Sequence, residues 1–140
     1  MAIRVMMADD SECMLAALRQ VLAEEAQIEI AAETNTFTAT LAKMADSKPD
    51  VLVLDLHLPQ CAEYGSEMVR EKLAGLKRIV AISFSNDEEA KALAQSYGVA
   101  VLLDKMNLYT DLIPAIVSSG DAATSVESTA SKASAASSGR

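Results

Sequence analysis

The sequence predicts an α/β fold, a doubly wound parallel sheet of five strands with five helices. Short apolar runs alternate five times with helical segments, and the connections between them are short. The run at 51–54 (VLVL) is apolar at every position, which is typical of a strand buried on both faces. Polar residues closely follow four of the apolar runs, at the edge where such sheets place their functional groups.

The first half of the chain predicts two strands and two helices before the central strand. Residues 3–8 (IRVMMA) form an apolar strand, and a capping side chain at Ser11, or at the aspartate before it, begins a helix to about residue 24. Apolar residues recur at helical spacing in that segment. Residues 28–32 predict the second strand. Thr36 then begins a helix, which a Lys-Pro-Asp breaker ends before the central strand.

The second half of the chain repeats this alternation. A polar loop with a glycine follows the central strand and leads into a helix at 66–73. Residues 79–82 predict the fourth strand. Acidic residues at the start of 86–97 favour the N-terminus of a helix that a glycine ends. The fifth strand is expected at 99–103 and the last helix at 110–117.

Composition and charge limit the classes of function. With 51% hydrophobic residues, the chain is expected to fold as one domain over 1–117, whereas the Ser/Ala/Thr-rich segment 118–140 predicts a disordered tail. The net charge of −8 argues against direct binding of nucleic acid. No apolar run approaches the roughly 20 residues of a membrane helix, and no signal-peptide pattern begins the chain. A cytoplasmic protein with reduced cysteines is therefore expected.

The polar residues at the strand ends are the candidates for chemistry. Asp9 and Asp10 follow the first strand, Asp55 the third and Ser83 the fourth, and Lys105 comes just after the fifth. Parallel strands end at one edge of a sheet, so these side chains are expected to lie close together. Crowded carboxylates repel one another unless a cation intervenes, and an all-oxygen cluster prefers Mg²⁺. The sequence therefore predicts a Mg²⁺ site.

The same residues fit phosphoryl transfer. A carboxylate can attack phosphorus and form an aspartyl phosphate. Catalysis of this transfer depends mainly on positioning and charge neutralisation, so it needs a metal ion, a cation and a hydroxyl group near the phosphoryl oxygens. The aspartate pair, Lys105 and Ser83 supply these groups, which leaves Asp55 as the candidate nucleophile.

These motifs resemble the response-regulator receiver domain of two-component signalling, the CheY-like superfamily with its flavodoxin-like fold. The resemblance covers 3–117 and depends on the aspartate pair, LVLDLHLP around Asp55, AISFSND around Ser83 and LLDKMN around Lys105. It implies the strand order 2-1-3-4-5. The run SFSN at 83–86 is similar to that of receivers in LuxR-type regulators.

The resemblance implies a metal site and a phosphodonor. Asp10 and Asp55 would bind Mg²⁺ directly, Asp9 would bind it through water, and the backbone carbonyl of His57 would complete the protein ligands. Asp55 would accept a phosphoryl group from a phosphohistidine on a sensor histidine kinase.

The resemblance also implies how the signal is held and passed on. Ser83 would hydrogen-bond the phosphoryl group and shift on activation, and Lys105 would pair with the phosphate. The face from the fourth strand through the last helix, 79–117, would meet a downstream protein or a second copy. The chain would then be no enzyme beyond its self-catalysed phosphorylation and dephosphorylation.

Three features depart from the family pattern. Leu102 stands where the switch aromatic of the family is usual, and Phe84 is bulkier than the small residue typical after the switch hydroxyl. The loop at 60–65 (QCAEYG) lacks the common Asp-Gly pair. Leu102 and Phe84 keep open a pseudo-receiver, a phosphorylation-independent module for protein interaction.

Other interpretations are weaker. An aspartyl-phosphate phosphatase of the haloacid-dehalogenase type has Asp-x-Asp after its first strand, whereas here the candidate nucleophile follows the third strand and His57 stands two residues later. An isolated aspartate pair caps helices, and an isolated loop lysine is solvated, but their joint placement favours a site. A stand-alone receiver and the receiver part of a longer regulator, such as a DNA-binding one, both fit the sequence.

Overall fold

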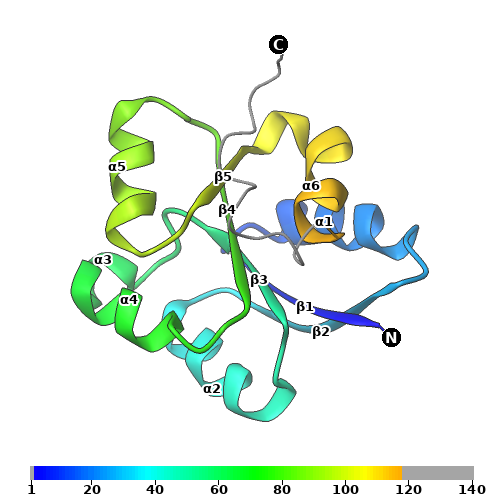
Figure 1. Ribbon diagram of the computed structural model, residues 1–140, viewed down its shortest axis with the longest axis horizontal. Coiled ribbons are helices and arrows are strands. Elements are labelled where there is room, and N and C mark those ends of the chain that lie inside the picture. Colours follow the sequence, from blue (N-terminus) through cyan, green and yellow to red (C-terminus); the bar gives the residue numbers. More distant parts are fainter. Residues whose placement is uncertain (1, 118–140) are drawn as a thin grey trace.

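The computed structural model describes residues 2–117 and confirms the predicted fold class. Five parallel strands form one sheet in the order β2-β1-β3-β4-β5, with helices on both faces (Figure 1). The elements are β1 (Ile3–Ala8), α1 (Glu12–Ala23), β2 (Ile28–Thr34), α2 (Phe37–Ser47), β3 (Val51–Asp55), α3 (Cys61–Tyr64), α4 (Ser66–Leu73), β4 (Arg78–Ser83), α5 (Glu88–Ser96), β5 (Val101–Asp104), the 3-10 turn η1 (Lys105–Asn107) and α6 (Leu108–Val117). The predicted tail at 118–140 lies outside the described residues.

Several elements differ from the sequence prediction; β2 continues to Thr34, and α6 begins at Leu108. The described residues contain six α-helices rather than five, because the loop after β3 forms the single turn α3. β5 begins at Val101 rather than at Val99. The amide of Val99 donates to the carbonyl of Ala94 at 2.9 Å, after Gly98 has turned the chain with φ 80°. Val99 therefore closes the end of α5 before the strand starts.

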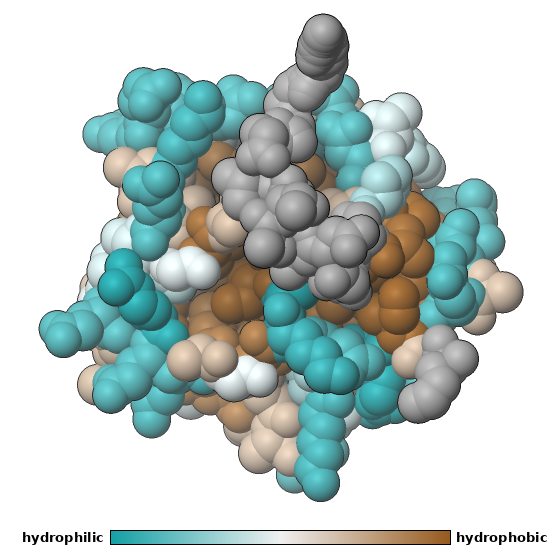
Figure 2. Space-filling model, in the orientation of Figure 1, coloured by the Kyte–Doolittle hydropathy of each residue, from teal (hydrophilic) through white to brown (hydrophobic). Residues whose placement is uncertain are grey.

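The central strands divide the core into two layers, because successive side chains of a strand point to opposite faces. Every residue of β3 is buried, as predicted for a strand covered on both sides. On one face, the buried residues of the sheet pack against α1 and α6; on the other, they pack against α2, α3, α4 and α5. In the space-filling view, hydrophilic residues occupy the rim and hydrophobic residues gather toward the centre (Figure 2).

The strand order places the ends of β1 and β3 side by side at the centre of the sheet. Ala8 pairs with Leu54, so the next residues, Asp9 and Asp55, come at the same level of neighbouring strands. The connections from β1 and from β3 leave in opposite directions here, and such a switch point is where open α/β sheets bind their ligands. Within the described residues, no helix is long and apolar enough to cross a membrane.

Lys48 ends α2 in a left-handed conformation. Its φ is 48° and its ψ is 62°, and its side chain is exposed. A residue with a Cβ atom is strained there, and glycine is not. We therefore expect Lys48→Gly to raise the free energy of unfolding by about 0.5–1 kcal/mol in urea denaturation. Lys48→Ala keeps the Cβ atom and should give no such gain. An equal gain in both variants would assign the effect to the lysine charge instead.

Candidate functional site

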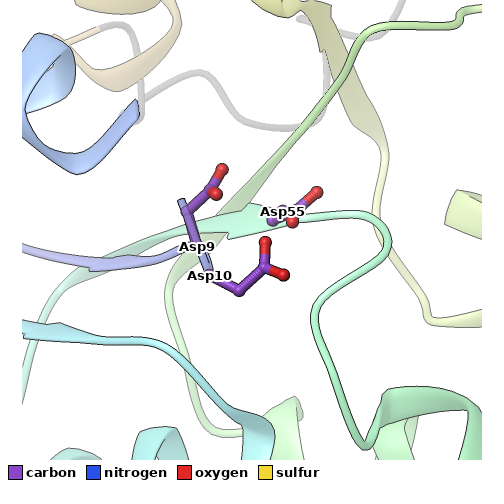
Figure 3. Close-up of side chains that lie close together, drawn as sticks. All are labelled: Asp9, Asp10 and Asp55. Atoms are coloured by element: carbon purple, nitrogen blue, oxygen red, sulfur yellow. The ribbon is translucent and has the colours of Figure 1, made fainter. Parts of the chain in front are cut away.

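The predicted acidic cluster forms at the carboxyl edge of the sheet. Asp9, Asp10 and Asp55 each offer a carboxylate oxygen, and these oxygens lie within 4.8 Å of one another (Figure 3). Asp9 and Asp55 are buried, with 0% and 5% of their surface exposed, whereas Asp10 is exposed. The cluster is thus open to solvent on the side of Asp10.

Local hydrogen bonds fix the position of Asp9. Its amide donates to the carbonyl of Thr34 at 3.0 Å, and its Oδ1 accepts from the amide of Ser11 at 2.9 Å. The hydroxyl of Ser11 in turn accepts from the amide of Met14 at 3.1 Å and caps α1. Of the two capping residues left open by the sequence, Ser11 is therefore the cap, and the carboxylate of Asp10 faces the cluster.

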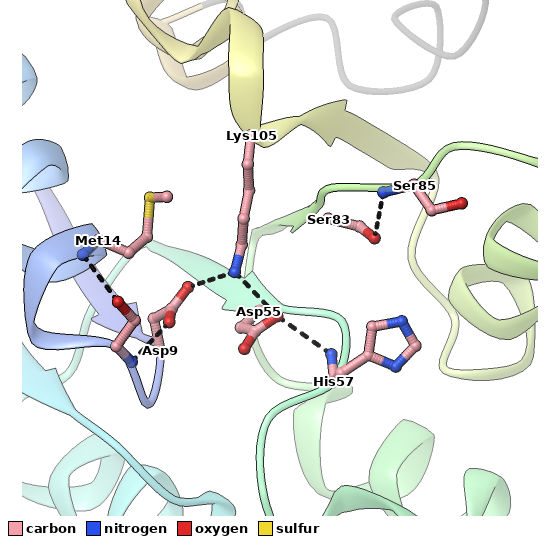
Figure 4. Close-up of polar contacts among 8 residues, drawn as sticks. Asp9, Met14, Asp55, His57, Ser83, Ser85 and Lys105 are labelled. Carbon is pink, nitrogen blue, oxygen red and sulfur yellow. Dashed lines mark hydrogen bonds and ion pairs between the residues drawn. The ribbon is translucent and has the colours of Figure 1, made fainter.

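Lys105 joins the two buried carboxylates. Its Nζ lies 2.9 Å from Oδ2 of Asp9 and 3.4 Å from Oδ1 of Asp55 (Figure 4). The lysine side chain is only 7% exposed, although it follows the edge strand β5. Oδ2 of Asp9 is buried, and its ion pair with Lys105 offsets the cost of burying this charged oxygen.

The charge of Asp55 is only partly compensated. Burial raises the pKa of this carboxyl, and the negative charge of Asp9 raises it further. Lys105 and the amide of His57 act in the opposite direction, yet the net pKa stays above the ordinary value. Burial of the charged carboxylate of Asp55 therefore stays unfavourable, even with the lysine in place.

His57 contacts the acidic cluster through its backbone. Its amide donates to Oδ1 of Asp55 at 3.2 Å, while its imidazole is exposed and points away from the carboxylates (Figure 4). The flanking residues Leu56 and Leu58 are 1% and 2% exposed. The structure thus places the backbone of His57 beside Asp55, and the binding of its carbonyl to a metal ion stays a prediction.

Ser83 lies at the same edge of the sheet, and its hydroxyl contacts the turn that follows β4. It is the last residue of β4 and is 1% exposed. Its Oγ accepts from the amide of Ser85 at 3.1 Å (Figure 4). The sequence located this hydroxyl correctly at the strand end, but its local turn could not be deduced from the sequence.

Phe84 contributes a contact that the sequence did not reveal. Its ring is 65% exposed, and the centroid lies 5.0 Å from Nζ of Lys105, within the range of a cation–π interaction. Leu102, at the position of the expected switch aromatic, is half-buried and packs against the core layer of α2 to α5. The exposed aromatic ring near the site is therefore on the β4–α5 loop.

The donor set fits Mg²⁺. It consists of carboxylate oxygens on neighbouring strands, without sulfur or imidazole ligands, and Mg²⁺ prefers such oxygen ligands together with water. A cation at this edge would also favour the charged form of Asp55, whose pKa is raised by burial and by the charge of Asp9.

The fold and this acidic edge define a receiver domain of two-component response regulators. Residues 5–117 match the family of the response regulator receiver domain, and the chain belongs to that family.

Relatives with assigned functions are longer proteins. Protein-glutamate methylesterase/protein-glutamine glutaminase 2 of Anaeromyxobacter dehalogenans is 34% identical over 110 residues, which cover 79% of this chain and 32% of that protein. Protein-glutamate methylesterase/protein-glutamine glutaminase 5 of Myxococcus xanthus is 34% identical over 101 residues, which cover 72% of this chain and 29% of that protein. The chain therefore spans about a third of the length of these relatives.

Solved structures show the same fold. The isolated receiver domain of RcsB from Salmonella enterica serovar Typhimurium superposes with a TM-score of 0.72 at 20% identity, over 84% of this chain and 87% of that chain. The response regulator domain of Thermotoga maritima CheB gives a TM-score of 0.72 at 18% identity, over 85% of this chain and 96% of that chain.

The raised pKa of Asp55 predicts a pH-dependent stability in metal-free protein. The folded state binds the proton more tightly than the unfolded state, so stability falls as the pH rises from about 4 through the raised pKa. At neutral pH, we expect Asp55→Asn to melt at a higher temperature than the wild type. In thermal unfolding with EDTA, the difference should shrink toward zero below about pH 4. A difference that is the same at all pH values would contradict this cause.

The two cysteines are expected to differ in reactivity. Cys13 is exposed, whereas Cys61 is 1% exposed, and burial, with a smaller contribution from the charge of Asp55, raises its pKa to about 11. Because the thiolate is the reactive form, one thiol per folded molecule should react readily with Ellman's reagent at about pH 8. The second thiol should react only after unfolding in guanidinium. Cys13→Ser should abolish the rapid reaction, and fast labelling of that variant would refute the burial of Cys61.

Proposed function

We propose that the chain is a phosphoacceptor of two-component signalling, phosphorylated on Asp55 by a sensor histidine kinase. The observation that carries this proposal is the linked group of Asp9, Lys105 and Asp55, in which one buried ammonium contacts two carboxylates of neighbouring strands. Such a group supplies an oxygen nucleophile, a cation for a phosphoryl oxygen and an acidic metal site within one cluster.

The proposed reaction uses the residues at the sheet edge. A carboxylate oxygen of Asp55 attacks phosphorus, the bond from phosphorus to the histidine nitrogen breaks, and the imidazole leaves with the electron pair. Lys105 pairs with an oxygen of the transferred group. Ser83 donates a hydrogen bond from its hydroxyl to another oxygen of this group. To do so, the hydroxyl moves away from the amide of Ser85, which it contacts in the unphosphorylated protein. Hydrolysis reverses the modification when water attacks phosphorus and the carboxylate of Asp55 leaves.

The acidic cluster is the proposed Mg²⁺ site. Asp10, Asp55 and the backbone carbonyl of His57 would bind the ion directly, and Asp9 would bind it through water. The ion supplies positive charge that neutralises the phosphoryl oxygens during transfer. The solvent-exposed position of Asp10 provides the access that the ion needs.

The face formed by β4, α5, β5 and α6 is the proposed output surface, for a downstream protein or a second copy of the chain. β5 is only half-buried, and Tyr109 at the start of α6 is 73% exposed. A stand-alone receiver in the cytoplasm and the receiver part of a longer cytoplasmic regulator both fit this proposal, and in both cases the chemistry proposed for the chain is limited to the aspartyl phosphate.

Incubation with acetyl phosphate and Mg²⁺ tests the proposal. We expect the intact mass to increase by one phosphoryl group, and we expect this gain to be lost entirely in Asp55→Asn and in the presence of EDTA. Asp46→Asn, which changes an exposed aspartate on α2, is the matched control and should be phosphorylated as the wild type is.

Two results together would contradict the phosphoacceptor function. They are the absence of a mass gain in the wild type and the absence of Mg²⁺-dependent binding of beryllofluoride. The chain would then be a pseudo-receiver. The contact of Phe84 with Lys105 would then indicate that the site is closed to phosphodonors.

A further inference from the structure

The loop that follows the phosphoacceptor is attached to the first turn of α2. The amide of Phe37 donates to the carbonyl of Pro59 at 3.1 Å, and the amide of Thr38 donates to Oε1 of Gln60 at 2.8 Å. Both amides belong to the first turn of a helix, where they have no partner within the helix itself. The loop therefore supplies acceptors for two amides of α2 from a distant part of the sequence, beside the N-cap Thr36, whose hydroxyl accepts from the amide of Ala39.

Gln60 makes its contact from a strained backbone. Its φ is 83° and its ψ is −18°, a left-handed conformation that disfavours residues with a Cβ atom. Glycine would adopt this conformation without strain, but glycine has no side chain to reach Thr38. The strain next to the site thus coincides with a contact that only a longer side chain can make.

A second contact holds the same loop on α2. The hydroxyl groups of Tyr64 and Thr38 lie 3.0 Å apart, and the ring of Tyr64 packs edge-on against Phe37 with centroids 4.9 Å apart. Tyr64 ends α3, the helical turn that follows Gln60 directly. The segment from Pro59 to Tyr64 is therefore bound to α2 at four points.

The near end of the loop is bound to the site itself. The amides of His57 and Leu58 donate to Oδ1 and to the carbonyl oxygen of Asp55, at 3.2 Å and 3.0 Å. His57 thus lies between an attachment to Asp55 and the attachments of Pro59 and Gln60 to α2. Release of the far attachment would allow the backbone at His57 to change its direction toward the acidic cluster.

We infer that Gln60 is a positioning residue, whose side chain docks the loop on α2 and thereby fixes the backbone of His57 for the metal ion. This inference rests on the proposed Mg²⁺ site. In this arrangement α2 helps to hold the site, and the loop at 60–65 carries the residue that docks on it.

Gln60→Gly separates this role from a merely structural one. The variant relieves the backbone strain and loses the hydrogen bond, so the two effects on global stability oppose each other. We expect the dissociation constant for Mg²⁺, measured by isothermal titration calorimetry, to rise by about three- to tenfold. In metal-free protein, hydrogen exchange of the Thr38 amide should become about tenfold faster. Gln60→Glu keeps an acceptor oxygen and should restore the protection of Thr38.

Ser47→Ala is the matched control, because it removes a side-chain hydrogen bond at the opposite end of α2. It should change neither the Mg²⁺ affinity nor the exchange of Thr38. Unchanged exchange of Thr38 in Gln60→Gly would overturn the docking contact, and unchanged Mg²⁺ affinity would overturn the positioning role. If the wild-type protein binds no Mg²⁺, the proposed metal site is refuted. This outcome is distinct from the one in which the wild type and Gln60→Gly bind Mg²⁺ equally well, which refutes only the positioning role.

Discussion

The interaction on which this site depends is the ammonium of Lys105 between the buried carboxylates of Asp9 and Asp55. Lys105 follows the edge strand β5, whereas its partners end β3 and follow β1, so the long side chain reaches past the end of β4. Two carboxylates without a cation would be very costly at this depth. The lysine thus makes the acidic edge compatible with a folded sheet and keeps a cation beside Asp55, the proposed phosphoacceptor.

Lys105 compensates only part of the cost of burying the carboxylate of Asp55. The pKa of Asp55 stays raised because burial and Asp9 outweigh the lysine and the amide of His57. A site with unbalanced negative charge attracts a divalent cation and is less stable without one. The ring centroid of Phe84 lies 5.0 Å from the ammonium of Lys105, so a cation–π contact adds to the two ion pairs of this cation.

Around this cluster lies a second set of contacts that holds the backbone. Asp9 is fixed by the carbonyl of Thr34 and the amide of Ser11, and the loop after Asp55 is attached to α2 through Gln60. The two sets meet at the start of α2, because β2 carries Thr34 and leads into that helix. Metal binding and the order of this helix are therefore expected to be linked.

The sequence by itself determined the strands, the two-sided burial of β3 and the edge at which Asp9, Asp55 and Lys105 gather. These follow from local rules, since apolar periodicity reports burial and parallel strands must end at one edge. Only the tertiary structure decided the start of β5, the turn α3, the bond from the Ser85 amide to Ser83 and the contact of Gln60 with Thr38. Each of these depends on which donor meets which acceptor once the chain is packed, and the residue types alone do not specify such a choice.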